Sequence, residues 1–285
     1  MRDLSDGELT ALVGDTWEAL ESHLAGMQRS RIESTERLFR FEVGLHSGFL
    51  NGVLRATVEP GDDSTLIGLV DLVAETRARF GARGLPWRWN VGPTSSPGLA
   101  DALVAAGLTV MGEMTGMAMD MGVAGASNAG GTPNTGGAPA PRPVDGGRVT
   151  EVLTHAELEV WLSVRRANLG LDEATTDAWR IAHGNAVLSA RAPLRHFVGR
   201  LGDRPVAGLT LYLGPDAAGI YHVDTIPEAR GLGFGSALTA RAMLAAHEAG
   251  YRYVVLVSSQ LGHSVYRGLG FRDLGRWTVL VDPGG

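Results

Sequence analysis

A glycine-rich turn in the last quarter of the sequence has the residues best suited to bind an anion. The run Arg230-Gly231-Leu232-Gly233-Phe234-Gly235-Ser236 follows an apolar segment and opens a long helical pattern. Glycine lets the backbone approach a ligand closely, and the start of a helix points unpaired N–H groups at an anion. The spacing differs from the dinucleotide-binding fingerprint, and a P-loop would need a lysine. We therefore predict a phosphate or pyrophosphate cradle, although a lone glycine-rich turn fits a purely structural role equally well.

Two residue types are absent from the chain of 285 residues, because it has no Cys and all 25 of its Lys+Arg residues are Arg. The missing Cys excludes a disulfide framework, a thiolate zinc site and a cysteine nucleophile. The missing Lys excludes P-loop and Schiff-base lysines. A GC-rich genome explains the missing Lys more simply than function does. No group of Asp, Glu and His has the spacing of metal ligands, so no metal site is predicted.

The formal net charge of −6 argues against nucleic acid as the main partner. No apolar run approaches 18 residues, so no membrane partner is expected. The first ten residues are polar and acidic, unlike a signal peptide, and a cytoplasmic location is the default expectation. Nothing in the sequence indicates the oligomeric state.

Residues 121–147 divide the chain, with 8 Gly, 4 Pro and no aromatic residue in this stretch of 27. Such a composition buries too little apolar surface to offset the entropy of ordering, so a flexible linker is predicted. It separates residues 1–120 from residues 148–285, each long enough to form a core of its own.

The second half alternates between strand and helix patterns, which predicts an α/β (α+β) fold with a mixed sheet flanked by helices. Strands are expected at Arg148–Leu153, His196–Leu201, Val206–Leu213, Ile220–Ile226, Tyr253–Val257 and Trp277–Val281, and helices at Thr154–Asn168, Asp172–Gly184, Gly233–Gly250 and Ser264–Leu269.

The first half repeats part of this order. Its strands are expected at Asn51–Glu59, Leu85–Val91 and Met114–Met121, and its helices at Ser64–Gly84 and Pro97–Ala106. The segment GLADALVAAGL, which ends at Gly107-Leu108, aligns with LGHSVYRGLGF, which ends at Gly270-Phe271. We interpret the chain as an internal duplication with a diverged first copy, with two unrelated α/β units as the alternative.

The pattern Arg230-x-x-Gly233-x-Gly235, then the strand at Tyr253–Val257, then Tyr266-x-x-Leu269-Gly270-Phe271, resembles the GNAT superfamily of acyl-CoA-dependent N-acetyltransferases. The resemblance covers residues 148–285 in element order and implies acetyl-CoA as cofactor. It implies that the backbone of the loop binds the pyrophosphate of coenzyme A. The residues of this loop are Arg230, Gly231, Leu232, Gly233, Phe234, Gly235 and Ser236.

The resemblance also implies a splayed strand whose edge, at Val223, Asp224 and Thr225, binds the pantetheine arm. Tyr266 is implied as the general acid near the thioester sulfur, and a phenol with a pKa of about 10 can protonate a leaving thiolate. Ser259 stands where many members have an Asn that contacts the pantetheine arm.

Asp224 replaces a residue that is usually small and apolar in the family, so it is a candidate general base, directly or through water. His222 is a second candidate, two residues away and on the same side of the strand. Both have structural alternatives: Asp224 could cap the turn before Pro227, and His222 could be a hydrogen-bonded residue of the sheet.

The first half lacks these features, since Leu103 aligns with Tyr266 and two carboxylates, Asp62 and Asp63, stand where the cradle would be. Trp87 and Trp89 could stack a substrate, but core packing explains them better. The sequence thus predicts a tandem acetyltransferase with one working site and a primary amine on a small molecule or peptide as acceptor. A non-catalytic acyl-CoA-binding or regulatory protein, and acetylation of a thiol-precursor amine as in mycothiol synthase, are the alternatives.

Overall fold

The computed structural model describes residues 3–26, 30–57, 63–122, 139–140, 142–184 and 188–284, with the backbone alone for 63–67. Most of the predicted linker, 123–138 and 141, lies outside these residues, and so do residues 58–62, where the first half was predicted to lack the cradle.

One mixed sheet of eleven strands runs through both halves, in the order β1-β2-β3-β4-β11-β5-β10-β9-β8-β7-β6. The strands are β1 (Arg31–Ser34), β2 (Leu38–Glu42), β3 (Asn51–Ala56), β4 (Arg88–Val91), β5 (Thr109–Asp120), β6 (Gly147–Glu151), β7 (Leu194–Leu201), β8 (Arg204–Leu213), β9 (Ala218–Thr225), β10 (Tyr253–Ser258) and β11 (Arg272–Val281). The helices are α1 (Asp6–Gly26), α2 (Asp63–Gly81), α3 (Leu99–Ala105), α4 (His155–Leu169), α5 (Glu173–Gly184), α6 (Phe234–Glu248) and α7 (Gln260–Gly268), with a 3₁₀ turn at Pro227–Ala229.

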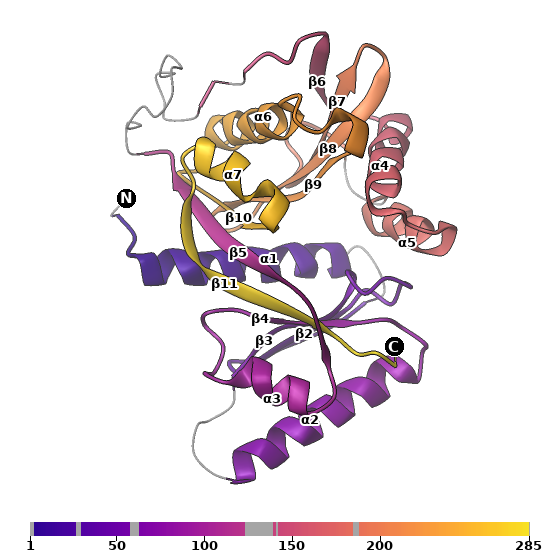
Figure 1. Ribbon diagram of the computed structural model, residues 1–285, viewed down its shortest axis with the longest axis vertical. Helices are drawn as coiled ribbons and strands as arrows, with labels where there is room; N and C mark the ends of the chain where they lie inside the picture. The colour runs from indigo at the N-terminus through magenta and orange to yellow at the C-terminus, as the bar shows by residue number, and fades with distance from the viewer. Residues whose placement is uncertain are drawn as a thin grey trace.

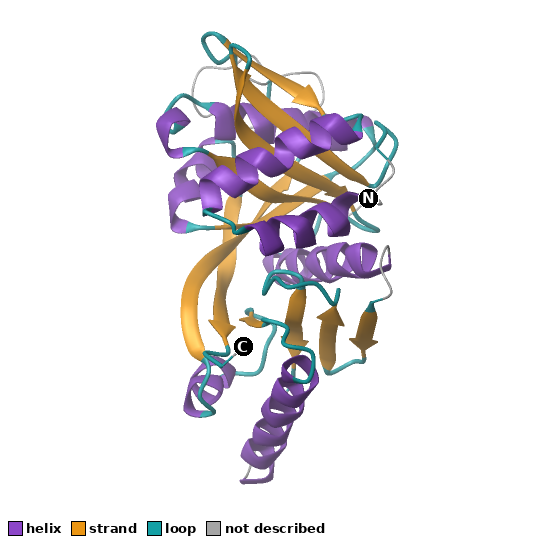
Figure 2. Cartoon of the chain, turned by 90° about the vertical axis from the view of Figure 1, so that its right-hand side faces the viewer, coloured by secondary structure: helices purple, strands orange, loops and turns teal. Residues whose placement is uncertain are grey.

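The two halves exchange their last strands. β5, from the first half, pairs with β10 of the second half, while β11, the last strand of the chain, pairs with β4 of the first. β5 and β11 also pair with each other along most of their length, so they lie side by side across the middle of the molecule (Figure 1). Figure 2 shows these two long strands curving from the upper part of the molecule into the lower part. The two halves on either side of the predicted linker therefore share one continuous sheet.

The two halves repeat the same series of elements. β3-α2-β4-α3-β5 matches β9-α6-β10-α7-β11, and both β3/β4 and β9/β10 are parallel pairs. The ends of α3 and α7 have the same hydrogen bonds, since Leu108 N donates to Leu103 O as Phe271 N donates to Tyr266 O. The glycine before each donor is left-handed, with φ 90° at Gly107 and 99° at Gly270. These bonds support the predicted alignment of Leu103 with Tyr266.

Helices cover both faces of the sheet. On β7, Phe197 packs in the core cluster beneath α6. Leu194 packs in the cluster formed with α1, and Val198 packs in the cluster formed with α4 and α5. Because residues alternate along a strand, α1, α4 and α5 share the face opposite to α6. Within the described residues, no helix is long and apolar enough to cross a membrane.

The predicted elements of the second half are confirmed to within a few residues, except that α7 begins earlier, at Gln260, and β7 and β11 begin earlier, at Leu194 and Arg272. The side chains of Thr154 and Asp172 cap the starts of α4 and α5, since they accept from Glu157 N and Thr175 N. In the first half β3 ends at Ala56, earlier than predicted, and α1, β1 and β2 were not predicted. Trp87 and Trp89 are core residues, 3% and 0% exposed.

The contact between β5 and β11 yields a test of the strand exchange. A Cβ at Gly116 of β5 would lie 1.9 Å from Cζ3 of Trp277 on β11, whereas a Cβ at Gly112 on the same strand meets nothing within 4 Å. We expect Gly116→Ala to lower the free energy of unfolding by about 1–3 kcal/mol through overpacking. Gly112→Ala should be neutral or slightly stabilising. Denaturant unfolding measures both, and equal effects would contradict the packing of Trp277 on Gly116.

Candidate active site

The candidate site begins where β9 and β10 part. Their parallel pairing runs from Ala218 with Val254 to Ile220 with Leu256 and goes no further, although β9 continues to pair with β8 as far as Thr225. The backbone of Tyr221–Thr225 on the side of β10 therefore has no strand partner. This is the splay that the resemblance implied for Val223, Asp224 and Thr225.

A β-bulge lies at the point of separation. Between the pairs Gly208/Asp224 and Thr210/Tyr221, both His222 and Val223 oppose Leu209 alone. His222 has a φ of 52° and is the one non-glycine residue with positive φ in the described ranges. After the bulge the strand alternates normally, so that Val223 packs on the core beneath α6 while His222 and Asp224 face α4 and α5. The prediction that His222 and Asp224 share a side is confirmed.

The glycine-rich loop connects β9 to α6. Gly231 and Gly233 have φ of 79° and 92°, and Gly233 is the N-cap of α6 without any side-chain cap bond. The first N–H groups of a helix have no acceptor within it, so they remain available here to an anion. Phe234, 1% exposed, packs under Gly199, where a Cβ would lie 2.7 Å from its ring. Phe234 thus holds the loop on the sheet, while Gly231 and Leu232 stay exposed.

Arg230 links the loop to the strand and to α4. Its Nε donates to Thr225 O at 3.2 Å, and its Nη2 donates to Asn168 Oδ1 at 3.0 Å. The loop therefore has backbone donors at its tip and a side chain that braces its base, an arrangement that fits a pyrophosphate.

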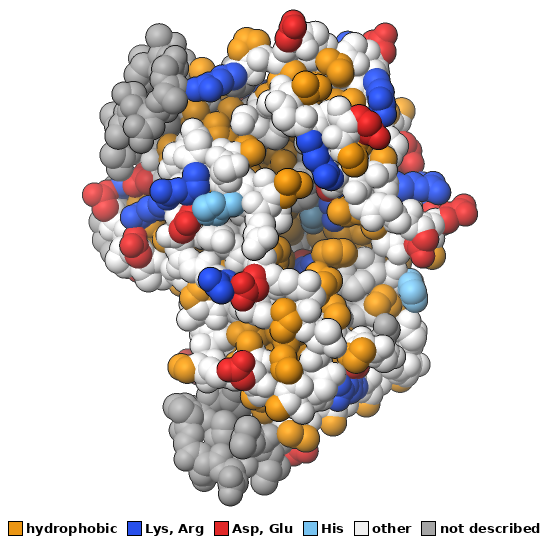
Figure 3. All heavy atoms as spheres, viewed as in Figure 1, with side chains coloured by type: hydrophobic (Ala, Val, Ile, Leu, Met, Phe, Trp, Pro, Cys, Tyr) orange, Lys and Arg blue, Asp and Glu red, His pale blue; other side chains and the backbone are white. Residues whose placement is uncertain are grey.

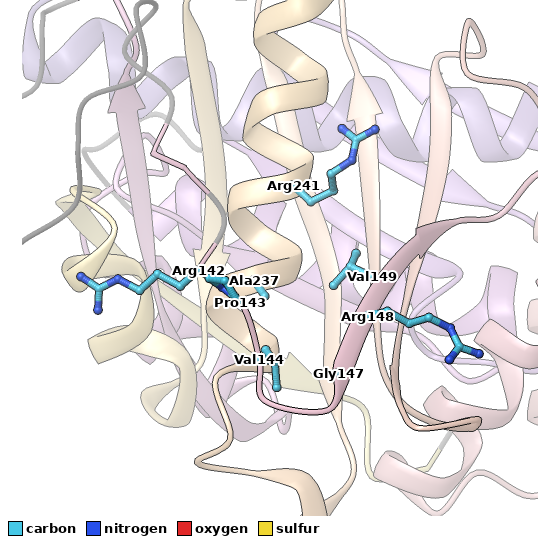
Figure 4. A pocket seen from close by; sticks show the side chains of 8 residues that line it. All are labelled: Arg142, Pro143, Val144, Gly147, Arg148, Val149, Ala237 and Arg241. Atoms are coloured by element: carbon cyan, nitrogen blue, oxygen red, sulfur yellow. The ribbon is translucent and has the colours of Figure 1, made fainter.

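A pocket of about 240 Å³ lies away from this loop, on the side of α6 that contains Ala237 and Arg241 (Figure 4). None of the predicted site residues lines this pocket.

Asp224 is held in a buried ion pair. It is 5% exposed, and its Oδ2 accepts from Arg165 Nη1 while Oδ1 accepts from Asn168 Nδ2, both at 2.7 Å. The guanidinium of Arg165 lies 4.0 Å above the centre of the Trp179 ring. Both partners of Asp224 lie on α4 and not in the turn before Pro227. Asp224 therefore does not cap that turn, which was the structural alternative considered from the sequence.

His222 belongs to a buried cluster of aromatic and histidine side chains. Its Nδ1 lies 3.3 Å from Thr210 Oγ1, and Thr210 also contacts His196. Burial, followed by the charge of Arg165, lowers the pKa of His222 well below its ordinary value, and burial lowers that of His196 to about 3. Both imidazoles are therefore neutral at pH 7.

Tyr266 lies on the other side of the splayed strands, on α7. It is 7% exposed and packs edge-on against Phe271, with ring centres 6.0 Å apart. A Cβ at Gly262 would lie 2.9 Å from its ring and 3.5 Å from its hydroxyl, so glycine at 262 makes room for the phenol. Burial, with a smaller effect from the charge of Asp224, raises the pKa of Tyr266 well above 10, so the phenol keeps its proton at neutral pH.

Ser259 is the N-cap of α7, with its side chain accepting from Gly262 N at 3.4 Å. The serine hydroxyl keeps its own proton free to donate.

Figure 3 shows that the face bearing α7 is hollowed between α7 and the helices α4 and α5, and histidine and arginine side chains are visible inside the hollow.

Several residues of this region were missed by the sequence reasoning. Arg165, Asn168 and Trp179 surround Asp224 and His222, but they come from α4 and α5, which have no motif. Arg165 alone gave a signal, since an arginine on the apolar face of an amphipathic helix needs a buried partner.

The Arg165–Asp224 pair yields a second test. Asp224→Ala leaves a buried guanidinium, 4% exposed, without its carboxylate, which typically costs about 3–5 kcal/mol. We therefore expect a large loss of stability in thermal or denaturant unfolding. Asp203→Ala, which removes a fully exposed partner of Arg148, is the control and should leave the midpoint unchanged. A small effect at Asp224 would show that the pair is not buried.

Residues 156–271 match the profile described as the acetyltransferase (GNAT) family. No curated protein sequence matches significantly. Among solved structures, a GCN5-related N-acetyltransferase from Kribbella flavida is 19% identical with a TM-score of 0.66, over 97% of this chain and 96% of that one. A GCN5-related N-acetyltransferase from Sphaerobacter thermophilus is 13% identical with a TM-score of 0.61, over 98% and 94%. A tandem GNAT protein from the clavulanic acid biosynthesis pathway is 18% identical with a TM-score of 0.54, over 99% and 97%. The chain therefore has the tandem GNAT fold, and its second half carries the match to the acetyltransferase family.

Proposed function

We propose that this protein is an N-acetyltransferase that moves the acetyl group of acetyl-CoA to a primary amine on a small molecule or peptide. One observation carries the proposal: the opening between β9 and β10 leads directly into the glycine-rich loop at the start of α6. An extended ligand with a pyrophosphate at one end fits such an opening, because backbone donors line both parts of it.

The residues that would hold the cofactor follow from this geometry. The N–H groups of Gly231–Ser236 would bind the pyrophosphate, and the free edge of Val223–Thr225 would bind the pantetheine arm. The hydroxyl of Ser259 is free to donate one more hydrogen bond. When bound, acetyl-CoA supplies an activated acetyl thioester.

Tyr266 is proposed as the general acid. This tyrosine keeps its phenol proton at neutral pH, and its hydroxyl has no hydrogen-bond partner among the described residues, so it can donate to the leaving sulfur. The unpaired backbone N–H groups at the bulge of β9 can stabilise the developing oxyanion.

Asp224, directly or through water, is proposed to take the proton from the acceptor amine. Each of its oxygens accepts one hydrogen bond and keeps a lone pair for another. His222 is neutral and could serve instead, although its low pKa makes it a weak base. A non-catalytic acyl-CoA-binding protein is the second candidate, favoured by the engagement of Asp224 with Arg165, which could leave the site without a base.

Tyr266→Phe tests the enzymatic proposal. The variant should bind acetyl-CoA with unchanged affinity by isothermal titration but lower kcat in a thiol-release assay by about 10²-fold or more, since it loses the proton donor. Tyr251→Phe is the control, because the Tyr251 hydroxyl donates to Gly214 O, outside the candidate site. Unchanged turnover in Tyr266→Phe would refute the general-acid role, and wild-type protein that binds acetyl-CoA without transferring acetyl groups would favour the second candidate.

A further inference from the structure

A second buried ion pair lies on the same face of the sheet as Asp224, and it comes from the first half of the chain. Arg88 on β4 donates from Nη2 to Glu21 Oε1 on α1 at 3.0 Å, with both side chains less than a tenth exposed. Trp17 Nε1 donates to the same oxygen at 3.2 Å. The other carboxylate oxygen, Glu21 Oε2, and Arg88 Nε are buried with no partner in the described part of the chain.

This pair shares its surroundings with the bulge of β9. The negative charge of Glu21 helps to raise the pKa of Tyr221, and the positive charge of Arg88 helps to lower the pKa of His222. Burial raises the pKa of Glu21 itself to about 7 against the opposing effect of Arg88. The pair and the bulge therefore lie in one poorly solvated region.

Phe49 connects the pair to the second half. Its ring centre is 5.3 Å from Arg88 Cζ and 6.4 Å from the centre of the Trp179 ring. Trp179 in turn contacts His222 and Arg165. Phe49 is 37% exposed, so its side chain carries this junction to the surface of the molecule. Residues of both halves thus meet beside the site proposed above.

The two atoms without partners are chemically complementary. In its ionised form Glu21 accepts through Oε2, whereas Arg88 Nε can only donate, and both atoms belong to one ion pair. Buried polar atoms of this kind are costly unless a ligand or water satisfies them. A ligand with an N–H next to an oxygen can satisfy both atoms at once.

We propose that Glu21 and Arg88 are the acceptor-positioning residues of the acetyltransferase site, and that the acceptor is a small amine with an oxygen next to its nitrogen, such as an amino alcohol or amino acid. Glu21 Oε2 accepts an N–H of the amine, and Arg88 Nε donates to the neighbouring oxygen. The inference rests on the proposed function. It gives the first half, which has Leu103 in place of Tyr266, a direct part in the reaction.

The test compares ethanolamine and L-serine with propylamine, which lacks the oxygen, in a thiol-release assay with saturating acetyl-CoA. The wild type should prefer the oxygen-bearing amines by at least about tenfold in kcat/KM. Glu21→Gln should reduce this preference to within about twofold, mainly through a higher KM, while acetyl-CoA affinity stays unchanged. Glu18→Gln is the matched control, because Glu18 also lies on α1 in an ion pair with an arginine, Arg55, and it should keep the wild-type preference.

A preference that survives in folded Glu21→Gln would overturn the inference. So would equal turnover of propylamine, or no turnover of either oxygen-bearing amine by protein that binds acetyl-CoA. If Glu21→Gln unfolds, the double variant Glu21→Gln/Arg88→Met removes both charges and leaves no unpaired one. Failure of the wild type to bind acetyl-CoA would instead refute the proposed function, and the inference with it.

Discussion

The separation of β9 from β10 is the constraint on which the rest of this structure depends. The parallel pairing ends at Ile220 and Leu256, and the next residues of β9 form a bulge in which His222 adopts a left-handed backbone. A non-glycine residue in that conformation costs free energy and persists only when its surroundings impose it. The buried cluster around His222 supplies these surroundings. The bulge leaves the edge of β9 without a strand partner toward β10 and directs Asp224 to α4, so the free edge and the buried carboxylate of the candidate site have one origin.

The exchange of β5 and β11 determines what lies beside this opening. Since each half completes the sheet of the other, the first half cannot swing away as a separate unit without breaking strand pairs. α1 is thereby held across β9, β10, β5 and β11, and the charge of its Glu21 acts on Tyr221, the residue before the bulge. The first half has Leu103 where the second has Tyr266, but it can in this way still contribute side chains to the candidate site.

Much of the second half could be predicted from its sequence, because its strands, caps and glycine turns are local signals. The spacing of Gly231, Gly233 and Gly235 and the helix-end pattern at Gly270 were sufficient to place the loop and Tyr266 on the elements where they lie. α1, β1 and β2 were missed, and the polar, acidic start of α1 hid the face that carries Leu9, Val13, Leu20 and Leu24.

The strand exchange could not be predicted, because the pattern of β5 is the same whichever strand it pairs with. The partners of Asp224 and of Glu21 were also out of reach. Arg165 is 59 residues from Asp224 and Arg88 is 67 residues from Glu21, and only the folded sheet brings them together. Local sequence thus specified the glycine-rich loop at the start of α6, while the buried ion pairs depend on the tertiary structure.

Amide hydrogen exchange with and without acetyl-CoA tests the central claim most directly, because the claim concerns backbone N–H groups in one half only. We expect acetyl-CoA to slow exchange in peptides that cover residues 221–236, at the free edge of β9 and the glycine-rich loop. Peptides from the corresponding part of the first half, residues 51–67, should exchange at the same rate in both conditions. Protection confined to residues 51–67, or protection that spares residues 221–236, would contradict the account.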